Sequence, residues 1–136
     1  MTIRVMLVDD SETLRQSLMH LLAGSSDLTV VGDVENGEKA VELCEAQKPQ
    51  VVVMDIVMPG LSGIEATRQI VGRHPEIRVL ALSIHANRGF VTEMLNAGAS
   101  GYLLKEDAFE ELAHAIRTVA AGQRYLSPQV KNWVGA

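Results

Sequence analysis

The residues most able to do chemistry are three aspartates, a serine and a lysine, each placed where an apolar run ends. Asp9 and Asp10 follow the run IRVMLV, and Asp55 follows VVVM. Ser83 and Lys105 end two later apolar runs. Grouped carboxylates are the ligands that a hard cation such as Mg²⁺ prefers. A carboxylate can also act as a nucleophile, and a lysine can neutralise charge on a transferring phosphoryl group.

Each of these residues also has an ordinary structural explanation. An aspartate can cap a helix, a serine can form a turn, and a lysine can end a strand in solvent. The chemical hypothesis therefore depends on whether the fold brings them together.

Five short apolar runs alternate with amphipathic stretches along the chain. The continuous Val-rich run at 51–54 suggests a strand that is buried on both faces, as in a parallel sheet covered by helices. The run at 28–33 is less apolar, so we place it nearer the sheet edge. The predicted strands are residues 3–8, 28–33, 51–54, 77–82 and 101–104.

Five helices are expected between and after these strands, each with one apolar face toward the sheet. In the last helix, Phe109 is among the residues expected to face inward. The residue pairs Ser62 with Glu65 and Asp107 with Glu110 have the spacing of capping boxes. The residues expected to open the helices are Ser11, Asn36, Ser62, Asn87 and Asp107.

This alternation predicts an α/β fold with a parallel sheet, helices on both faces and right-handed crossovers. With five strands we predict a flavodoxin-like doubly wound sheet of order 2-1-3-4-5, with five helices. Strands one, three, four and five are then neighbours. Their carboxyl ends would bring the aspartates, the serine and the lysine into one crevice at the topological switch point, where such sheets bind ligands.

Three carboxylates in one crevice would repel one another. Two unit charges about 4 Å apart interact by about 4 kcal/mol at an effective dielectric near 20. Without a cation, one carboxylate would tend to take up a proton. We therefore predict Mg²⁺ as the cofactor and Asp55, central between the other acids and Lys105, as the nucleophile of a phosphoryl transfer. Ser83 would donate a hydrogen bond to a phosphoryl oxygen.

Composition indicates one domain with an aliphatic core. The 136 residues are 47% hydrophobic but only 4% aromatic. No apolar run approaches the roughly 20 residues of a membrane span, and we find no signal peptide. The single Cys44 excludes an internal disulfide and suits a reducing compartment. We expect a cytoplasmic location and no membrane association.

The net charge of −5 is unevenly distributed. Residues 1–65 hold 11 acids and 4 bases, whereas residues 66–136 hold 6 acids and 8 bases. The acidic half suits a cation site. Neither half has the dense Lys/Arg stripe of a DNA-binding face, so this segment is not expected to make the main contacts to DNA.

The combined pattern DD, D-x-x-M-P-G-x-x-G, S and K resembles the receiver domain of two-component response regulators, a CheY-like fold, over about residues 3 to 121. The resemblance implies that Asp55 accepts a phosphoryl group from a sensor histidine kinase. It implies that Asp10, Asp55 and the backbone carbonyl of Val57 bind Mg²⁺ directly, and that Asp9 acts through water.

The same resemblance implies a conformational switch. Ser83 and Lys105 would sense the phosphoryl group, and Tyr102 would be the aromatic switch residue that turns inward as the loop after Ser83 closes. The alternative for Tyr102 is a half-buried strand tyrosine with no role in switching.

Two segments are similar to the NarL/FixJ class, in which a receiver precedes a LuxR-type helix-turn-helix. They are AGASGYLLK (97–105) and GQRYLSP (122–128). The resemblance implies a transcription regulator that dimerises when phosphorylated and binds DNA through a C-terminal domain absent from this chain. We expect the receiver domain at 1–122 and, at 123–136, a tail that begins the linker to that domain.

Several alternatives remain at this point. The chain could be a stand-alone receiver or a phosphorylation-independent interaction module. A Mg²⁺-dependent phosphohydrolase of the haloacid dehalogenase type would need a second acid two residues after its nucleophile, where this chain has Val57. A nucleotide or flavin binder of similar topology would need G-x-G-x-x-G, a P-loop or a phosphate-cradling Gly/Ser/Thr loop after the first strand, none of which we find. We expect no enzyme activity beyond self-phosphorylation and self-dephosphorylation.

Ile84 departs from the common receiver pattern, in which a smaller residue is frequent after the serine. A bulky Ile84 beside the apolar Val57 would restrict the water that attacks a phosphoryl group. We therefore hypothesise slow loss of the phosphoryl group.

Overall fold

A parallel sheet forms the centre of the computed structural model, which describes residues 2–85 and 87–132. Its strand order is β2-β1-β3-β4-β5-β6, and every neighbouring pair is parallel. The predicted order of the first five strands is confirmed, and a short sixth strand extends the sheet. The strands are β1 (Ile3–Val8), β2 (Leu28–Val34), β3 (Val51–Asp55), β4 (Arg78–Ser83), β5 (Gly101–Leu104) and β6 (Tyr125–Leu126).

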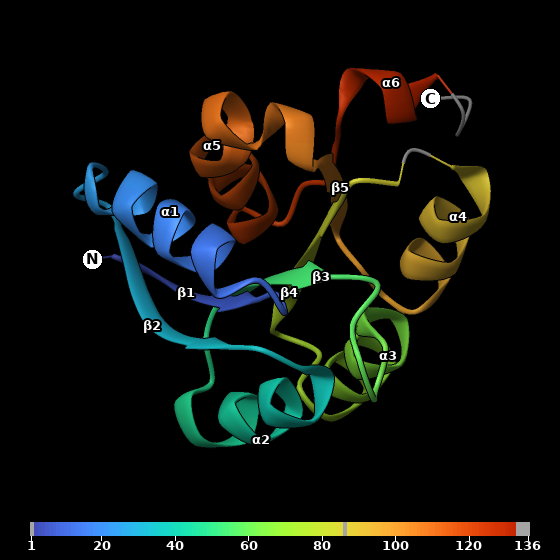
Figure 1. Cartoon of the computed structure of the whole chain (residues 1–136), viewed down its shortest axis with the longest axis horizontal. Coiled ribbons are helices and arrows are strands. Elements are labelled where there is room, and N and C mark those ends of the chain that lie inside the picture. Colours follow the sequence, from blue (N-terminus) through green and yellow to red (C-terminus); the bar gives the residue numbers. More distant parts are fainter. Residues whose placement is uncertain (1, 86, 133–136) are drawn as a thin grey trace.

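Helices cover both faces of this sheet, as Figure 1 shows. One group, α1 and α5, lies on one face, and the group α2, α3 and α4 lies on the other. None of the described helices is long and apolar enough to pass through a bilayer. The helices are α1 (Glu12–Ala23), α2 (Gly37–Gln47), α3 (Gly63–Arg73), α4 (Arg88–Asn96), α5 (Ala108–Ala120) and α6 (Pro128–Lys131).

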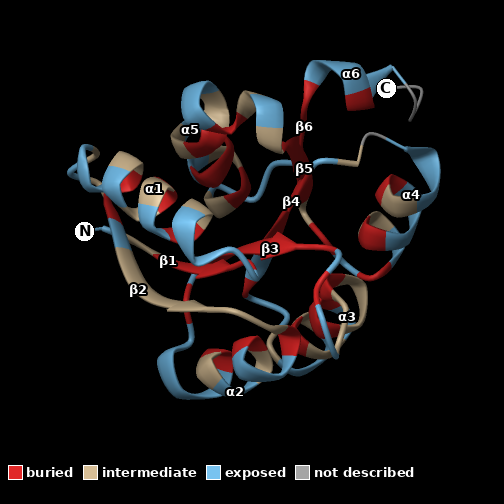
Figure 2. Cartoon of the chain, in the orientation of Figure 1, coloured by how far each residue is buried: buried red, intermediate tan, exposed pale blue. Residues whose placement is uncertain are grey.

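Alternate strand residues build two separate cores, one on each face of the sheet. In β3, Val52 and Met54 face the helices α2, α3 and α4, whereas Val51 and Val53 face α1 and α5. All five residues of β3 are buried, and Figure 2 shows this strand in the middle of the buried region. The predicted strand buried on both faces is therefore confirmed.

Four of the expected helix starts are confirmed by their hydrogen bonds. The side chain of the capping residue accepts a hydrogen bond from the backbone N–H three residues later in α1, α2, α3 and α4. These bonds satisfy N–H groups that a helix leaves unpaired at its start. The capping residues are Ser11, Asn36, Ser62 and Asn87.

The start of α5 differs from the expectation. Lys105–Asp107 form a short 3₁₀ turn, and Asp107 makes no capping hydrogen bond. Its backbone is close to helical (φ −97°, ψ −5°), so the side chain is not directed back over the first turn as in an extended N-cap. The predicted inward position of Phe109 is also wrong. Phe109 is 59% exposed because Ala108 and Leu112 occupy the face of α5 toward the sheet.

Residues 125–131 form two elements that the sequence pattern does not predict. β6 runs beside β5, with Tyr102 opposite Leu126. The Ser127 N–H donates to the Tyr102 carbonyl (3.0 Å), and the Ser127 hydroxyl accepts from the Leu104 N–H (3.0 Å). In the helix α6 that follows, Val130 is fully buried. This part of the expected tail is thus packed on the sheet, whereas residues 133–136 lie outside the described residues.

Candidate functional site

Three aspartates meet at the carboxyl ends of β1 and β3. Asp9 and Asp10 follow β1, and Asp55 is the last residue of β3. Val8 lies opposite Met54 in the ladder between these strands, so both strands end at the same level. One oxygen of each carboxylate lies within 4.8 Å of the others, with Asp9 and Asp55 buried and Asp10 exposed. The predicted acidic cluster is confirmed as a geometric arrangement.

Lys105 extends from the turn after β5 into this cluster. Its Nζ atom lies 2.9 Å from Asp9 Oδ2 and 3.7 Å from Asp55 Oδ1. Among the described residues, Asp9 Oδ2 is buried and makes no hydrogen bond of good geometry, despite the short distance to Lys105. Lys105 therefore neutralises part of the charge on this buried oxygen by ion pairing.

The surroundings of Asp55 disfavour the ionised form of its carboxylate. Burial is the largest cause, followed by repulsion from Asp9, and together they raise the pKa of Asp55 to about 7 although Lys105 opposes the shift. A divalent cation would remove the repulsion. The three candidate ligand atoms are carboxylate oxygens, and one of the aspartates, Asp10, is exposed to solvent. Mg²⁺ prefers such oxygen ligands together with several retained waters. The residues present therefore fit a Mg²⁺ site.

Ser83 lies near the end of β3 that carries Asp55, and Ser83 and Tyr102 both bond to the loop between β4 and α4. Ser83 is fully buried at the end of β4, one residue after Leu82, which is opposite Asp55. Its Oγ accepts a hydrogen bond from the His85 N–H (2.9 Å). Tyr102 is also fully buried, and its hydroxyl donates to the His85 carbonyl (2.7 Å). Burial raises the pKa of Tyr102, an effect that a hydrogen bond with Ser83 opposes.

Tyr102 is therefore fully buried rather than half-buried. The phenol lies inward and holds the same loop residue that Ser83 holds. A role of Tyr102 in switching stays a prediction.

The loop after β3 is held tightly against the strand end. The Gly63 N–H donates to the Ile56 carbonyl (2.8 Å), and the Leu61 N–H donates to the Glu38 carboxylate (3.2 Å). A Cβ atom on Gly63 would lie only 1.9 Å from the Asp55 carbonyl oxygen. The glycine thus permits the close approach that positions the backbone around Val57, whose side chain is 53% exposed. A role of the Val57 carbonyl as a metal ligand stays a prediction.

Sequence reasoning missed Arg15, a charged residue that reaches the acidic loop from α1. The Arg15 side chain is only 9% exposed, and its guanidinium bonds to the Asp9 carbonyl. A signal was available, because Arg15 lies one turn before Leu18 on the apolar face of its helix. A charge at such a position needs a polar partner inside the protein.

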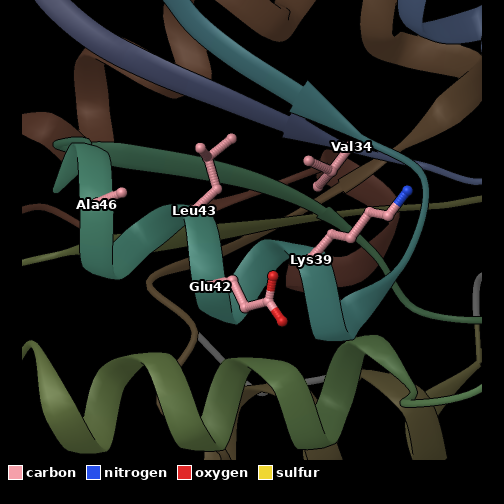
Figure 3. Close-up of a pocket in the computed structure, with 5 residues that line it drawn as sticks. All are labelled: Val34, Lys39, Glu42, Leu43 and Ala46. Carbon is pink, nitrogen blue, oxygen red and sulfur yellow. The ribbon is translucent and has the colours of Figure 1, made fainter.

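A cavity in the described structure is lined by none of the three aspartates. It has a volume of about 430 Å³ and lies beside β2 and α2 (Figure 3). Its lining is mostly apolar and includes neither the aspartates nor Ser83 or Lys105, so we place the chemistry at the acidic cluster instead. The lining residues are Val34, Lys39, Glu42, Leu43 and Ala46.

Comparisons with known proteins agree with this site. The chain matches the response regulator receiver domain family over residues 5–117. It is 44% identical to the transcriptional regulatory protein DegU of Brevibacillus brevis over 128 residues, 94% of this chain and 54% of that protein. It is 45% identical to the response regulator GacA of Pseudomonas protegens over 128 residues, 94% of this chain and 60% of that protein. The chain thus spans little more than half the length of these curated relatives.

A solved structure gives the same assignment. The crystal structure of a two-component response regulator of the LuxR family from Aurantimonas sp. SI85-9A1 superposes with a TM-score of 0.94 at 35% identity. The alignment covers 99% of this chain and 96% of that chain. Sequence, fold and strand-end residues agree, and the chain belongs to the response regulator receiver domain family.

Proposed function

We propose that Asp55 is the phosphoryl acceptor of this receiver domain and that a sensor histidine kinase is the donor. The observation that carries the proposal is the buried Asp55 carboxylate, held among two further acids and 3.7 Å from Lys105 Nζ. One Asp55 oxygen attacks the phosphorus of a phosphohistidine. The P–N bond breaks, its electron pair returns to the imidazole nitrogen, and an acyl phosphate forms on Asp55.

The other residues of the site support this step by charge and position. Lys105 favours the ionised form of Asp55 and can pair with a phosphoryl oxygen. Asp10, Asp55 and the Val57 carbonyl would hold Mg²⁺ directly and Asp9 would do so through water. When bound, Mg²⁺ supplies positive charge to the carboxylates and the phosphoryl oxygens.

The product is expected to switch the β4–α4 loop. The Ser83 hydroxyl accepts a hydrogen bond from His85, and Tyr102 is bonded to the same residue. If Ser83 turns to donate a hydrogen bond to a phosphoryl oxygen, its bond to His85 changes and the loop can shift between two arrangements. We propose that this loop and Tyr102 are the two-state element.

For the full-length protein we propose phosphorylation-dependent control of transcription. The support is the name of the DegU relative, a transcriptional regulatory protein, and the LuxR-family assignment of the solved structure. In this proposal the full protein dimerises when phosphorylated and binds DNA through a helix-turn-helix beyond this chain. The receiver unit, expected from sequence at 1–122, would extend through α6, and the linker would start after it. The location would be cytoplasmic, and the only catalysis would be self-phosphorylation and self-dephosphorylation.

The proposed function is tested by intact mass after incubation with acetyl phosphate. Wild type is expected to gain one phosphoryl group with Mg²⁺ and none with EDTA. Asp27→Asn is the matched control, because Asp27 is an exposed acid paired with Arg117 away from the site, and it should behave as wild type. A phosphoryl gain that is independent of Mg²⁺, or steady turnover of a phosphate ester, would contradict the proposal.

Ile84→Ala is expected to shorten the lifetime of the phosphorylated protein. Ile84 and Val57 are 72% and 53% exposed and lie in the two loops that follow Ser83 and Asp55. Removing the larger side chain should admit the attacking water more easily and speed the decay about threefold, or roughly 0.6 kcal/mol in barrier height. The decay is followed by intact mass after removal of the donor, with Phe109→Ala as an exposed apolar control. Equal decay of Ile84→Ala and wild type would show that Ile84 does not shield the group.

A further inference from the structure

Arg15 joins the acidic loop to the neighbouring strand. Its Nη1 donates to the Asp9 carbonyl oxygen (2.6 Å), and its Nε donates to Asp33 Oδ2 (2.9 Å). Asp33 lies near the end of β2, and Asp9 follows β1. The guanidinium therefore connects the loop that carries both β1 aspartates to the strand beside it.

The Asp9 carbonyl belongs to the peptide unit that links Asp9 to Asp10. A peptide unit is planar, so fixing its oxygen fixes the plane from which the next residue departs. The same loop is held at two other points, because the Asp9 N–H donates to the Val34 carbonyl (3.1 Å) and Asp9 Oδ1 accepts from the Ser11 N–H (2.8 Å). Arg15 supplies the remaining constraint, on the carbonyl side of Asp9.

An arginine at this position would destabilise the fold relative to an apolar residue if packing were its only role. Leu18 and Leu22, on the same face of α1, are each 1% exposed. Burying a guanidinium costs several kcal/mol of desolvation, at an order-of-magnitude level, unless good hydrogen bonds offset it. Its planar fork can donate in two fixed directions at once, which an ammonium group on a flexible stem does not do. Arg15 uses that property, with one N–H donating to a backbone oxygen and one to a carboxylate.

We propose that Arg15 is a positioning residue of the Mg²⁺ site. It fixes the Asp9–Asp10 peptide so that both carboxylates are oriented for a cation, and it does so through the Asp9 carbonyl without being a ligand. This inference rests on the proposed function, because it concerns the affinity of the same acidic cluster for Mg²⁺.

The test is the affinity for divalent cations with no phosphoryl donor present. Mg²⁺ binding is measured by calorimetry, and Mn²⁺ binding by the loss of the free-ion resonance signal. Arg15→Met keeps an unbranched apolar stem and removes the fork, and we expect it to weaken binding about tenfold, as is usual for residues that orient metal ligands. Arg15→Lys keeps the charge with one point donor and should recover about a third of that loss on a logarithmic scale.

A second readout separates positioning from general damage. The rate of phosphorylation by acetyl phosphate is measured against Mg²⁺ concentration. Arg15→Met should need about tenfold more Mg²⁺ for half-maximal rate but reach nearly the wild-type rate at saturation. Arg117→Met is the matched control, because Arg117 also pairs with an aspartate, Asp27, but in an exposed position. Its cation affinity should equal that of wild type.

The outcomes distinguish this inference from the proposed function. Wild type that binds no Mg²⁺ would overturn both. Wild type that binds Mg²⁺, with Arg15→Met binding it within twofold, would overturn the role of Arg15 alone. If Arg15→Met does not fold, Asp33→Asn decides, because it removes the outer partner and leaves the arginine in place. About threefold weaker binding in Asp33→Asn would support the positioning role, and unchanged binding would overturn it.

Discussion

Replacing Asp55 by Asn is expected to abolish phosphoryl acceptance and, at the same time, to stabilise the cation-free fold at pH 8. The first effect follows because an amide cannot form the acyl phosphate. The second follows from the site, where burial and the neighbouring acids raise the pKa of Asp55 to about 7. An isostere without charge removes the cost of ionising this group inside the folded protein.

The sign of the pH dependence follows from the raised pKa. The unfolded chain ionises Asp55 near its ordinary pKa of 3.8, whereas the folded protein retains the proton up to about pH 7. The free energy of unfolding of wild type therefore falls as the pH rises from about 4 to about 7, and the penalty is fully present above that range. We expect Asp55→Asn to gain on the order of 3 kcal/mol at pH 8 and only a small fraction of that at pH 4.

Urea unfolding in EDTA at several pH values measures this effect. Asp27→Asn is the matched control with the opposite sign, because Arg117 lowers the pKa of Asp27 and the substitution loses an exposed ion pair. Mg²⁺ should stabilise wild type much more than Asp55→Asn, since it binds the ionised cluster. If Asp55→Asn were no more stable than wild type at pH 8, the carboxylates would not be in electrostatic conflict.

Gly63→Ala is expected to lower the free energy of unfolding by at least about 3 kcal/mol, a large value for a single methyl group. The added Cβ would lie 1.9 Å from the Asp55 carbonyl oxygen and 2.8 Å from the Ile56 Cα, both of them backbone atoms. The end of β3 cannot move away freely, because β3 pairs with β1 on one side and β4 on the other. The clash must therefore displace the start of α3 or the strand end that carries Asp55.

Gly72→Ala is a matched control within the same helix. A Cβ there meets nothing within 4 Å, so the substitution should be neutral or stabilise α3 by about 0.5–1 kcal/mol. Denaturant unfolding gives both values, and intact mass shows whether Gly63→Ala still accepts the phosphoryl group. A Gly63→Ala protein within about 1 kcal/mol of wild type would mean that the loop after β3 can relax without cost.

The sequence predicts most of this architecture because two signals agree at each strand end. An apolar run marks the strand, and the polar residue after it marks the edge where parallel strands meet. This is why the acids, Ser83 and Lys105 could be grouped before the fold was known, and why the strand order of the first five strands is confirmed. The capping residues Ser11 and Asn87 can also be predicted from local sequence, because each side chain bonds to a backbone N–H only three residues later.

What could not be predicted depends on contacts between distant segments. The pairing of Tyr102 with Leu126 joins residues that no local pattern relates, so β6 was missed. Arg15 bonds to Asp33, which lies 18 residues later in the chain. The role of Arg15 therefore becomes apparent only in the folded structure. Phe109 has the composition of a core residue, but α5 is rotated so that Ala108 and Leu112 meet the sheet. In each case tertiary packing decides what periodicity leaves open.

The short strand β6 has a consequence for how the domain behaves in a crowded solution. Without it, β5 would end the sheet with the sequence Gly-Tyr-Leu-Leu, an apolar run with unpaired backbone groups along its outer side. Such an edge invites pairing with other chains. Two residues of β6, followed by the buried Val130, cover that edge. The segment after α5 is therefore expected to protect this edge of β5 against pairing with other chains.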